Sequence, residues 1–204
     1  DYNPELRGNL EAQIANVADE LAYTAHDLDD GLRSGMITPH MLSGMTLWEI
    51  VTESINWRGP IFDELTRHRL IRRLIGIEVN DLVHTTAQRL RESNVKSVEE
   101  LQRLPYNVIS FSEDTIRRNR QLKDFLYNNL YRHHRVVRMA VKAERIIGDL
   151  FGGYRSDPEM LPEHVQGLLE GRGLERTICD YVAGMTDRYA VEEHQKLFDP
   201  TTRP

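Results

Sequence analysis

The sequence predicts an all-α protein, and three observations lead to this class. Apolar residues recur at spacings of three and four along most of the 204-residue chain, which is the period of an amphipathic helix. The alternation of apolar and polar residues that indicates a half-buried strand is almost absent. The 13 glycines and 8 prolines mostly separate the periodic segments, as residues that end helices do. We therefore expect a multi-helix bundle that forms one helical unit over residues 1–204.

The N-terminal half divides into helices at capping and breaking residues. Helices are expected at about residues 9–33, in a short turn from residue 39, at 47–57 and at 60–90. Thr38 and Pro39 are typical of an N-cap followed by proline in the first turn. Gly59 ends one helix, and Pro60 is expected to begin the long helix that follows.

The C-terminal half follows the same pattern. Helices are expected at about residues 98–104, at 112–150, near residue 162 and at 174–196. Ser97 and Glu100 have the spacing of a capping box. Ser112 is expected to begin the longest helix of the chain, and Gly152 with Gly153 to break it.

The composition excludes several classes of protein. A chain with 40% hydrophobic and 28% charged residues is neither disordered nor collagen-like. With 26 Lys and Arg against 32 Asp and Glu, its net charge of −6 argues against a wholly basic nucleic-acid coat. The one cysteine, Cys179, excludes an internal disulfide and suits a reducing compartment. We expect Cys179 to be buried among apolar neighbours, and the protein to be cytoplasmic with no membrane partner.

The first expected helix carries the densest polar cluster. Asp19, Tyr23 and Asp27 are four residues apart, so they lie on one helix face. A row of this kind can hold a cation at one end and sugar hydroxyls at the other. The alternative is a solvated acidic face. Against it, Asp29 and Asp30 add to Asp27 in the C-terminal half of the helix, where the helix dipole disfavours negative charge.

A second charged feature lies between residues 115 and 145. Nine Lys and Arg face only Asp124 and Glu144 there, a net charge of +7, so the rest of the chain carries −13. A basic helix over 115–145 could bind single-stranded DNA, an acidic neighbouring subunit or a regulatory phosphate group. The protein would then be a helical binding module without catalysis. Pairing of these cations with the acidic remainder of the chain is the other interpretation.

The dipeptide His26-Asp27 resembles the metal-binding pair of HD-domain phosphohydrolases. A complete site of that kind requires a second His, a separate His-Asp pair and a distal Asp. None of the other seven histidines is followed by Asp, so the four-ligand set cannot be assembled from this chain.

Longer motifs resemble one family of these phosphohydrolases. The segments Leu10–Tyr23 and His26–Arg33 resemble the downstream signature of deoxyguanosinetriphosphate triphosphohydrolase-like proteins. Ile178–Ala190 resembles the C-terminal motif of that family, and Tyr131–Val136 and Asp149–Phe151 fit between the two. The resemblance covers nearly the whole chain. It implies the C-terminal part of an HD-domain-type bundle.

The resemblance also implies an activity and a set of site residues. The family hydrolyses a dNTP to a deoxynucleoside and triphosphate at a divalent metal, magnesium or manganese. Asp19 matches the distal metal ligand, whereas His26-Asp27 is not the family's metal-binding pair. Tyr23 and Asp27 match positions that pack on the deoxyribose and bond its 3′-hydroxyl. Arg67 resembles an arginine that contacts the triphosphate, although its stem could instead cover apolar surface. A homo-oligomer is expected, and no residue is assigned as catalytic.

The family's upstream half, with three of its four metal ligands, has no counterpart in this chain. Asp1 is therefore interpreted as a cut end, and the fragment alone is expected to be inactive. A phosphohydrolase acting on monophosphates or cyclic nucleotides is a further alternative that the two long motifs disfavour.

Overall fold

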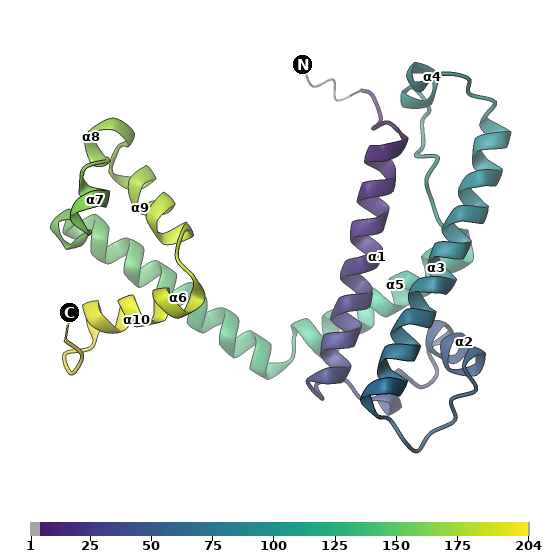
Figure 1. Cartoon of the computed structure of the whole chain (residues 1–204), viewed down its shortest axis with the longest axis horizontal. Coiled ribbons are helices and arrows are strands. Elements are labelled where there is room, and N and C mark those ends of the chain that lie inside the picture. Colours follow the sequence, from purple (N-terminus) through teal and green to yellow (C-terminus); the bar gives the residue numbers. More distant parts are fainter. Residues whose placement is uncertain (1–4, 204) are drawn as a thin grey trace. The chain divides into compact units, whose positions relative to one another are not determined.

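The computed structural model describes residues 5–203 and confirms the all-α class. Over that range the chain forms helices and connecting segments, with no β-strand (Figure 1). The helices divide into two compact units, of which the first ends at His133 and the second begins at His134. The single unit expected over residues 1–204 thus differs from the observed packing, because each unit has its own buried core. No helix in the described range combines the length and apolar character needed to cross a membrane.

The N-terminal unit contains five α-helices among its described residues. They are α1 (Leu10–Arg33), α2 (Thr46–Ser54), α3 (Glu64–Ser93), α4 (Val98–Gln102) and α5 (Glu113–Leu126), with a 3-10 turn η1 (Pro39–Leu42) and a π-helical turn η2 (Tyr127–Tyr131). The expected start of the third helix at Pro60 is wrong. Asp63 caps α3 instead, because its Oδ1 accepts the backbone N–H of Thr66 at 2.8 Å and satisfies a donor of the first turn.

One apolar core holds the N-terminal unit together. The helix α1 packs along α3, and α2 lies against α3 and α5 (Figure 1). Leu28 of α1, Leu70 of α3 and Leu126 of α5 are at most 2% exposed and belong to the same cluster. The apolar periodicity that predicted these helices therefore marks the faces that they bury.

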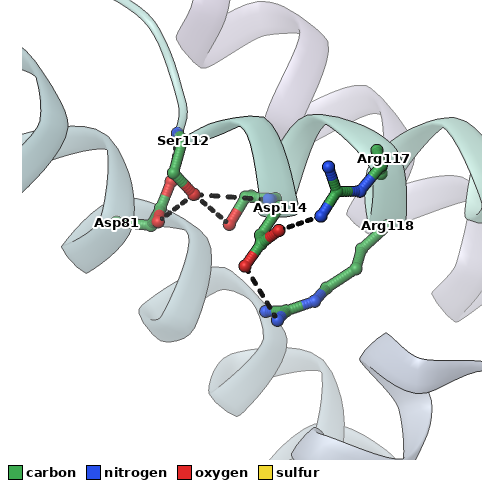
Figure 2. A network of polar contacts seen from close by, with 6 residues as sticks. Asp81, Ser112, Asp114, Arg117 and Arg118 are labelled. Atoms are coloured by element: carbon green, nitrogen blue, oxygen red, sulfur yellow. Dashed lines mark hydrogen bonds and ion pairs between the residues drawn. The ribbon is translucent and has the colours of Figure 1, made fainter.

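The start of α5 is fixed to α3 by side-chain hydrogen bonds. The backbone N–H and the hydroxyl of Ser112 donate to the two carboxylate oxygens of Asp81 on α3, at 2.8 and 2.7 Å. Figure 2 shows this contact beside Asp114, which pairs with Arg117 and Arg118 in the first turns of α5. The expected start of this helix at Ser112 is confirmed, and the cap also anchors α5 on its neighbour.

The long basic helix expected over 112–150 is wrong. The helix α5 ends at Leu126, η2 follows, and α6 (His134–Ser156) begins the second unit. The side-chain amides of Asn128 and Asn129 donate to the carbonyl groups four residues earlier, at 2.8 and 2.9 Å. These bonds use carbonyl oxygens that a regular helix needs. The basic run 115–145 is consequently shared between two units.

The C-terminal unit is built around α6. It continues with η3 (Pro158–Met160), α7 (Glu163–Gln166), α8 (Leu169–Arg172), α9 (Leu174–Ala183) and α10 (Asp187–Phe198). The break expected at Gly152 and Gly153 does not occur, since both lie inside α6. A Cβ at Gly153 would lie 3.0 Å from Cζ of Phe198, so glycine there allows α10 to approach closely.

Two further expectations fail in this unit. The last helix, expected over 174–196, is divided at Gly184, and Thr186 caps α10 by accepting the N–H of Tyr189 at 3.2 Å. Cys179 is exposed, so the expected buried thiol is wrong. Its neighbour Ile178 is fully buried, and successive helical residues point about 100° apart, which turns Cys179 to the surface.

Candidate functional site

An open hollow of about 530 Å³ lies between α1 and the α5–η2 segment of the N-terminal unit. We call it the α1–α5 groove. Its lining residues come from three elements: Asp19, Glu20, Tyr23, Thr24 and Asp27 from α1, Lys123, Asp124 and Leu126 from α5, and Tyr127 and Tyr131 from η2.

The row expected on one face of the first helix lines this groove. Asp19, Tyr23 and Asp27 all face it, whereas His26 is not among its lining residues. The expectation that the three share a face is confirmed by their common groove. Tyr23 is 61% exposed, which leaves a large aromatic ring available for a ligand to pack on. The roles given to these residues by the resemblance stay predictions.

Asp27 is the residue of the row that the unit holds in place. The hydroxyl of Tyr131 donates a hydrogen bond to its Oδ2. Burial raises the pKa of the Asp27 carboxyl, the charge of Asp30 raises it further, and the charge of His26 lowers it. A half-buried carboxylate with one oxygen held in this way is a fixed acceptor rather than a freely rotating surface group.

Tyr131 is the site residue that the sequence analysis missed. The motif Tyr131–Val136 includes it without a site role, yet η2 brings both Tyr127 and Tyr131 to the groove. Turns of π-helix often occur at functional sites. The adjacent residues Asn128 and Asn129 were the signal, since asparagines inside a helical segment compete for backbone hydrogen bonds.

One ion pair spans the groove. Lys123 of α5 pairs with Glu20 of α1, and their side chains are 43% and 56% exposed. An exposed pair of this kind contributes little to stability, about 0–1 kcal/mol. An anionic ligand can therefore compete with Glu20 for Lys123 at small cost.

Arg67 lies apart from the row on α1. Its Nη1 contacts Oδ1 of Asp29 at 2.6 Å, and its Nη2 contacts Nε2 of His68 at 3.0 Å. The residue is 6% exposed and lines a different hollow, of about 360 Å³, together with Arg33 and Phe62. The structure thus does not bring Arg67 to the α1–α5 groove. Its buried, paired guanidinium also differs from a surface arginine whose stem covers apolar residues.

The described residues do not complete a metal site. Over residues 5–203, no group of three or more His, Cys, Asp or Glu side chains is placed to hold a metal ion. Asp19 is an exposed carboxylate at the groove. It can supply one oxygen ligand, and a hard divalent cation requires several.

The cations of residues 115–145 are partly paired within their own units. In the N-terminal unit, Asp114 pairs with two arginines of α5 and Glu20 pairs with Lys123. In the C-terminal unit, Arg145 lies 3.8 Å from Asp149. The run is divided between two units and four of its nine cations are paired within them, so it does not form a single basic helix. Binding of single-stranded DNA or of an acidic subunit by these residues stays a prediction.

Comparison with known proteins agrees with the resemblance of the motifs. Residues 109–196 match the family model described as a phosphohydrolase-associated domain. The chain is 45% identical, over 203 residues, to deoxyguanosinetriphosphate triphosphohydrolase-like proteins of Geobacter metallireducens and Geobacter sulfurreducens, covering 99% of this chain and 53% of each relative. A protein of the same name from Ralstonia pickettii is 42% identical over 191 residues, which is 93% of this chain and 49% of that protein. The chain spans about half the length of the curated relatives it matches.

Proposed function

We propose that this chain, which is similar to the C-terminal half of deoxyguanosinetriphosphate triphosphohydrolase-like proteins over nearly its whole length, supplies the sugar-binding side of a dNTP triphosphohydrolase. The observation that carries the proposal is the α1–α5 groove, where an exposed tyrosine stands between two carboxylates on α1. The reaction would give a deoxynucleoside and inorganic triphosphate. A cytoplasmic homo-oligomer is part of the same proposal and rests on the resemblance alone.

In this proposal Tyr23 and Asp27 read the sugar. The exposed ring of Tyr23 packs on the deoxyribose, where a 2′-hydroxyl would project into it. Asp27 accepts a hydrogen bond from the 3′-hydroxyl through the oxygen that Tyr131 does not hold. A carboxylate fixed before binding loses less conformational entropy when the ligand arrives.

We further propose that Asp19 supplies one ligand of a magnesium or manganese ion in the whole protein. Such an ion polarises a phosphate and activates water when it is bound. Because the described residues do not complete its site, we derive no catalytic step from it. Arg67 contacts the triphosphate in this proposal only if it exchanges Asp29 for a phosphate, since that pair is closed in the structure.

Tyr23→Ala tests the sugar-reading role in a longer protein that also contains the family's upstream half. We expect the preference for dGTP over GTP to fall by about tenfold or more, because removing the ring opens space for the 2′-hydroxyl. The ratio of kcat/KM for the two nucleotides measures it. Tyr127→Ala is the matched control, since Tyr127 lines the groove outside the α1 row. A Tyr23→Ala protein that rejects GTP as strongly as wild type would show that Tyr23 does not read the sugar.

The purified 204-residue chain is expected to release no measurable triphosphate from dGTP with magnesium or manganese. The physical reason is the single carboxylate ligand at the groove, which holds a divalent ion weakly. Ion chromatography of the products measures the release, with the longer protein as positive control. Metal-dependent release by the chain alone, abolished by a chelator, would contradict the proposal that this chain supplies only the sugar-binding side and one metal ligand.

A further inference from the structure

A buried carboxyl group on α3 is used by none of the roles above. Glu78 of α3 is 1% exposed, and its Oε2 has no hydrogen-bond partner among the described residues. The buried Oδ1 of Asn119 on α5 also lacks a partner there. Buried polar atoms are nearly always hydrogen-bonded, so two such atoms on neighbouring side chains require an explanation.

Charged groups from three helices face Glu78. Burial is the largest influence and raises its pKa, while the side-chain hydrogen bond with Asn119 and the charge of Lys123 lower it. Asp81 on α3 and Glu20 on α1 raise it again, and the pKa reaches about 7. Two of these groups, Lys123 and Glu20, also line the groove.

A proton on Glu78 would supply the donor that these two acceptor atoms lack. A protonated carboxyl carries an O–H donor, whereas an ionised carboxylate can only accept. The neutral form therefore supplies a donor next to the Asn119 amide, whose oxygen has none. It also avoids the free energy of burying an unpaired charge.

We propose that Glu78 is a proton-binding site linked to the charge of the α1–α5 groove. An anion that takes Lys123 cancels the positive charge that favours the ionised form of Glu78, and its own charge repels that form. Binding of an anion at Lys123 then proceeds with uptake of a proton by Glu78. By reciprocity, protonation of Glu78 strengthens anion binding in the groove. The link depends on the groove and is independent of the reaction proposed for the whole protein.

Infrared spectroscopy of the 204-residue chain tests the proton site. The carbonyl band of a protonated carboxyl is followed from pH 5 to 9, and Glu78→Gln identifies the part that belongs to Glu78. We expect a band that titrates near neutral pH in wild type and is absent from Glu78→Gln. Glu53→Gln, an exposed glutamate of α2, is the matched control and should keep the band. If Glu78→Gln removes no band that titrates above about pH 6, the proposal is overturned.

The same band tests the link to the groove. Lys123→Met should raise the midpoint of the Glu78 titration and Glu20→Gln should lower it, each by roughly half a pH unit. Inorganic triphosphate should raise the midpoint in wild type and leave Lys123→Met unmoved. A midpoint that neither substitution shifts, or that triphosphate leaves unchanged in wild type, would overturn the link. Neither result depends on nucleotide hydrolysis. The link between Glu78 and the groove can therefore fail while the proposed function holds, and the reverse is also possible.

Discussion

Replacing Gln13 with alanine is expected to destabilise the N-terminal unit by about 3 kcal/mol. Gln13 of α1 is 3% exposed, and its Oε1 accepts the backbone N–H groups of Val108 at 2.9 Å and of Ile109 at 3.2 Å. Its Nε2 donates to the carbonyl of Gly8 at 2.8 Å. Val108 and Ile109 are at most 5% exposed, so alanine leaves two buried donors unpaired, each at a cost of about 1–3 kcal/mol.

Urea unfolding followed by tryptophan fluorescence measures this effect. Both tryptophans of the chain, Trp48 and Trp57, lie in the N-terminal unit, so the signal reports on that unit. Gln102→Ala is the matched control, because its partly exposed side chain donates one hydrogen bond, to the carbonyl of Arg7 at 3.0 Å. We expect that control to lose at most about 0.5 kcal/mol.

A second variant separates the acceptor from the donor. Gln13→Glu keeps an oxygen for the two N–H groups and loses the donor to Gly8, so its stability should lie between wild type and alanine. Hydrogen exchange at the amides of Val108 and Ile109 gives the local readout. Native protection of both amides in Gln13→Ala, with a loss of stability no larger than in Gln102→Ala, would rule out the bridging role.

The bridge made by Gln13 also shows which parts of the fold the sequence can predict. Caps are local, so Ser97 and Ser112 were found from the residues that follow them, and each accepts the expected backbone N–H. Gln13 instead contacts residues that are 95 and 96 positions away. Nothing in the spacing of α1 distinguishes a buried glutamine from one in solvent. The same holds for Glu78, which is buried by helices that come later and earlier in the chain.

The candidate site likewise combines residues that local spacing predicts with residues that only tertiary packing brings together. Asp19, Tyr23 and Asp27 could be grouped from the sequence, because a spacing of four fixes which side chains share a helix face. Lys123 and Tyr131 complete the groove from more than 90 residues further along, and periodicity says nothing about which helices become neighbours. The π-helical turn that places Tyr131 also follows the end of α5 at Leu126, within the helix that the sequence predicts over 112–150.

Asp29→Asn is expected to destabilise the N-terminal unit by about 3 kcal/mol. The side chain of Arg67 is 8% exposed and pairs with Asp29 at 2.6 Å, so the variant leaves a buried cation with only the exposed and more distant Glu64 carboxylate nearby. Combining Asp29→Asn with Arg67→Met should recover most of the loss, because an apolar side chain needs no partner there. Glu64→Gln is the matched control, since Glu64 is 79% exposed and 3.7 Å from Arg67, and it should change the free energy of unfolding by less than about 0.5 kcal/mol.

The comparison of Asp29→Asn with Glu64→Gln also tests whether Arg67 can contact a triphosphate, because Arg67 is paired with Asp29 in the structure. If Asp29→Asn costs about 3 kcal/mol, Arg67 is held by Asp29, and a phosphate can reach the guanidinium only by replacing that carboxylate. A phosphate would then restore stability to Asp29→Asn, and unfolding with and without inorganic triphosphate measures that restoration. If Asp29→Asn costs no more than Glu64→Gln, the guanidinium reaches solvent without Asp29. In that case a triphosphate can bind Arg67 directly. The Arg67–Asp29 pair then does not prevent the triphosphate contact that the resemblance implies.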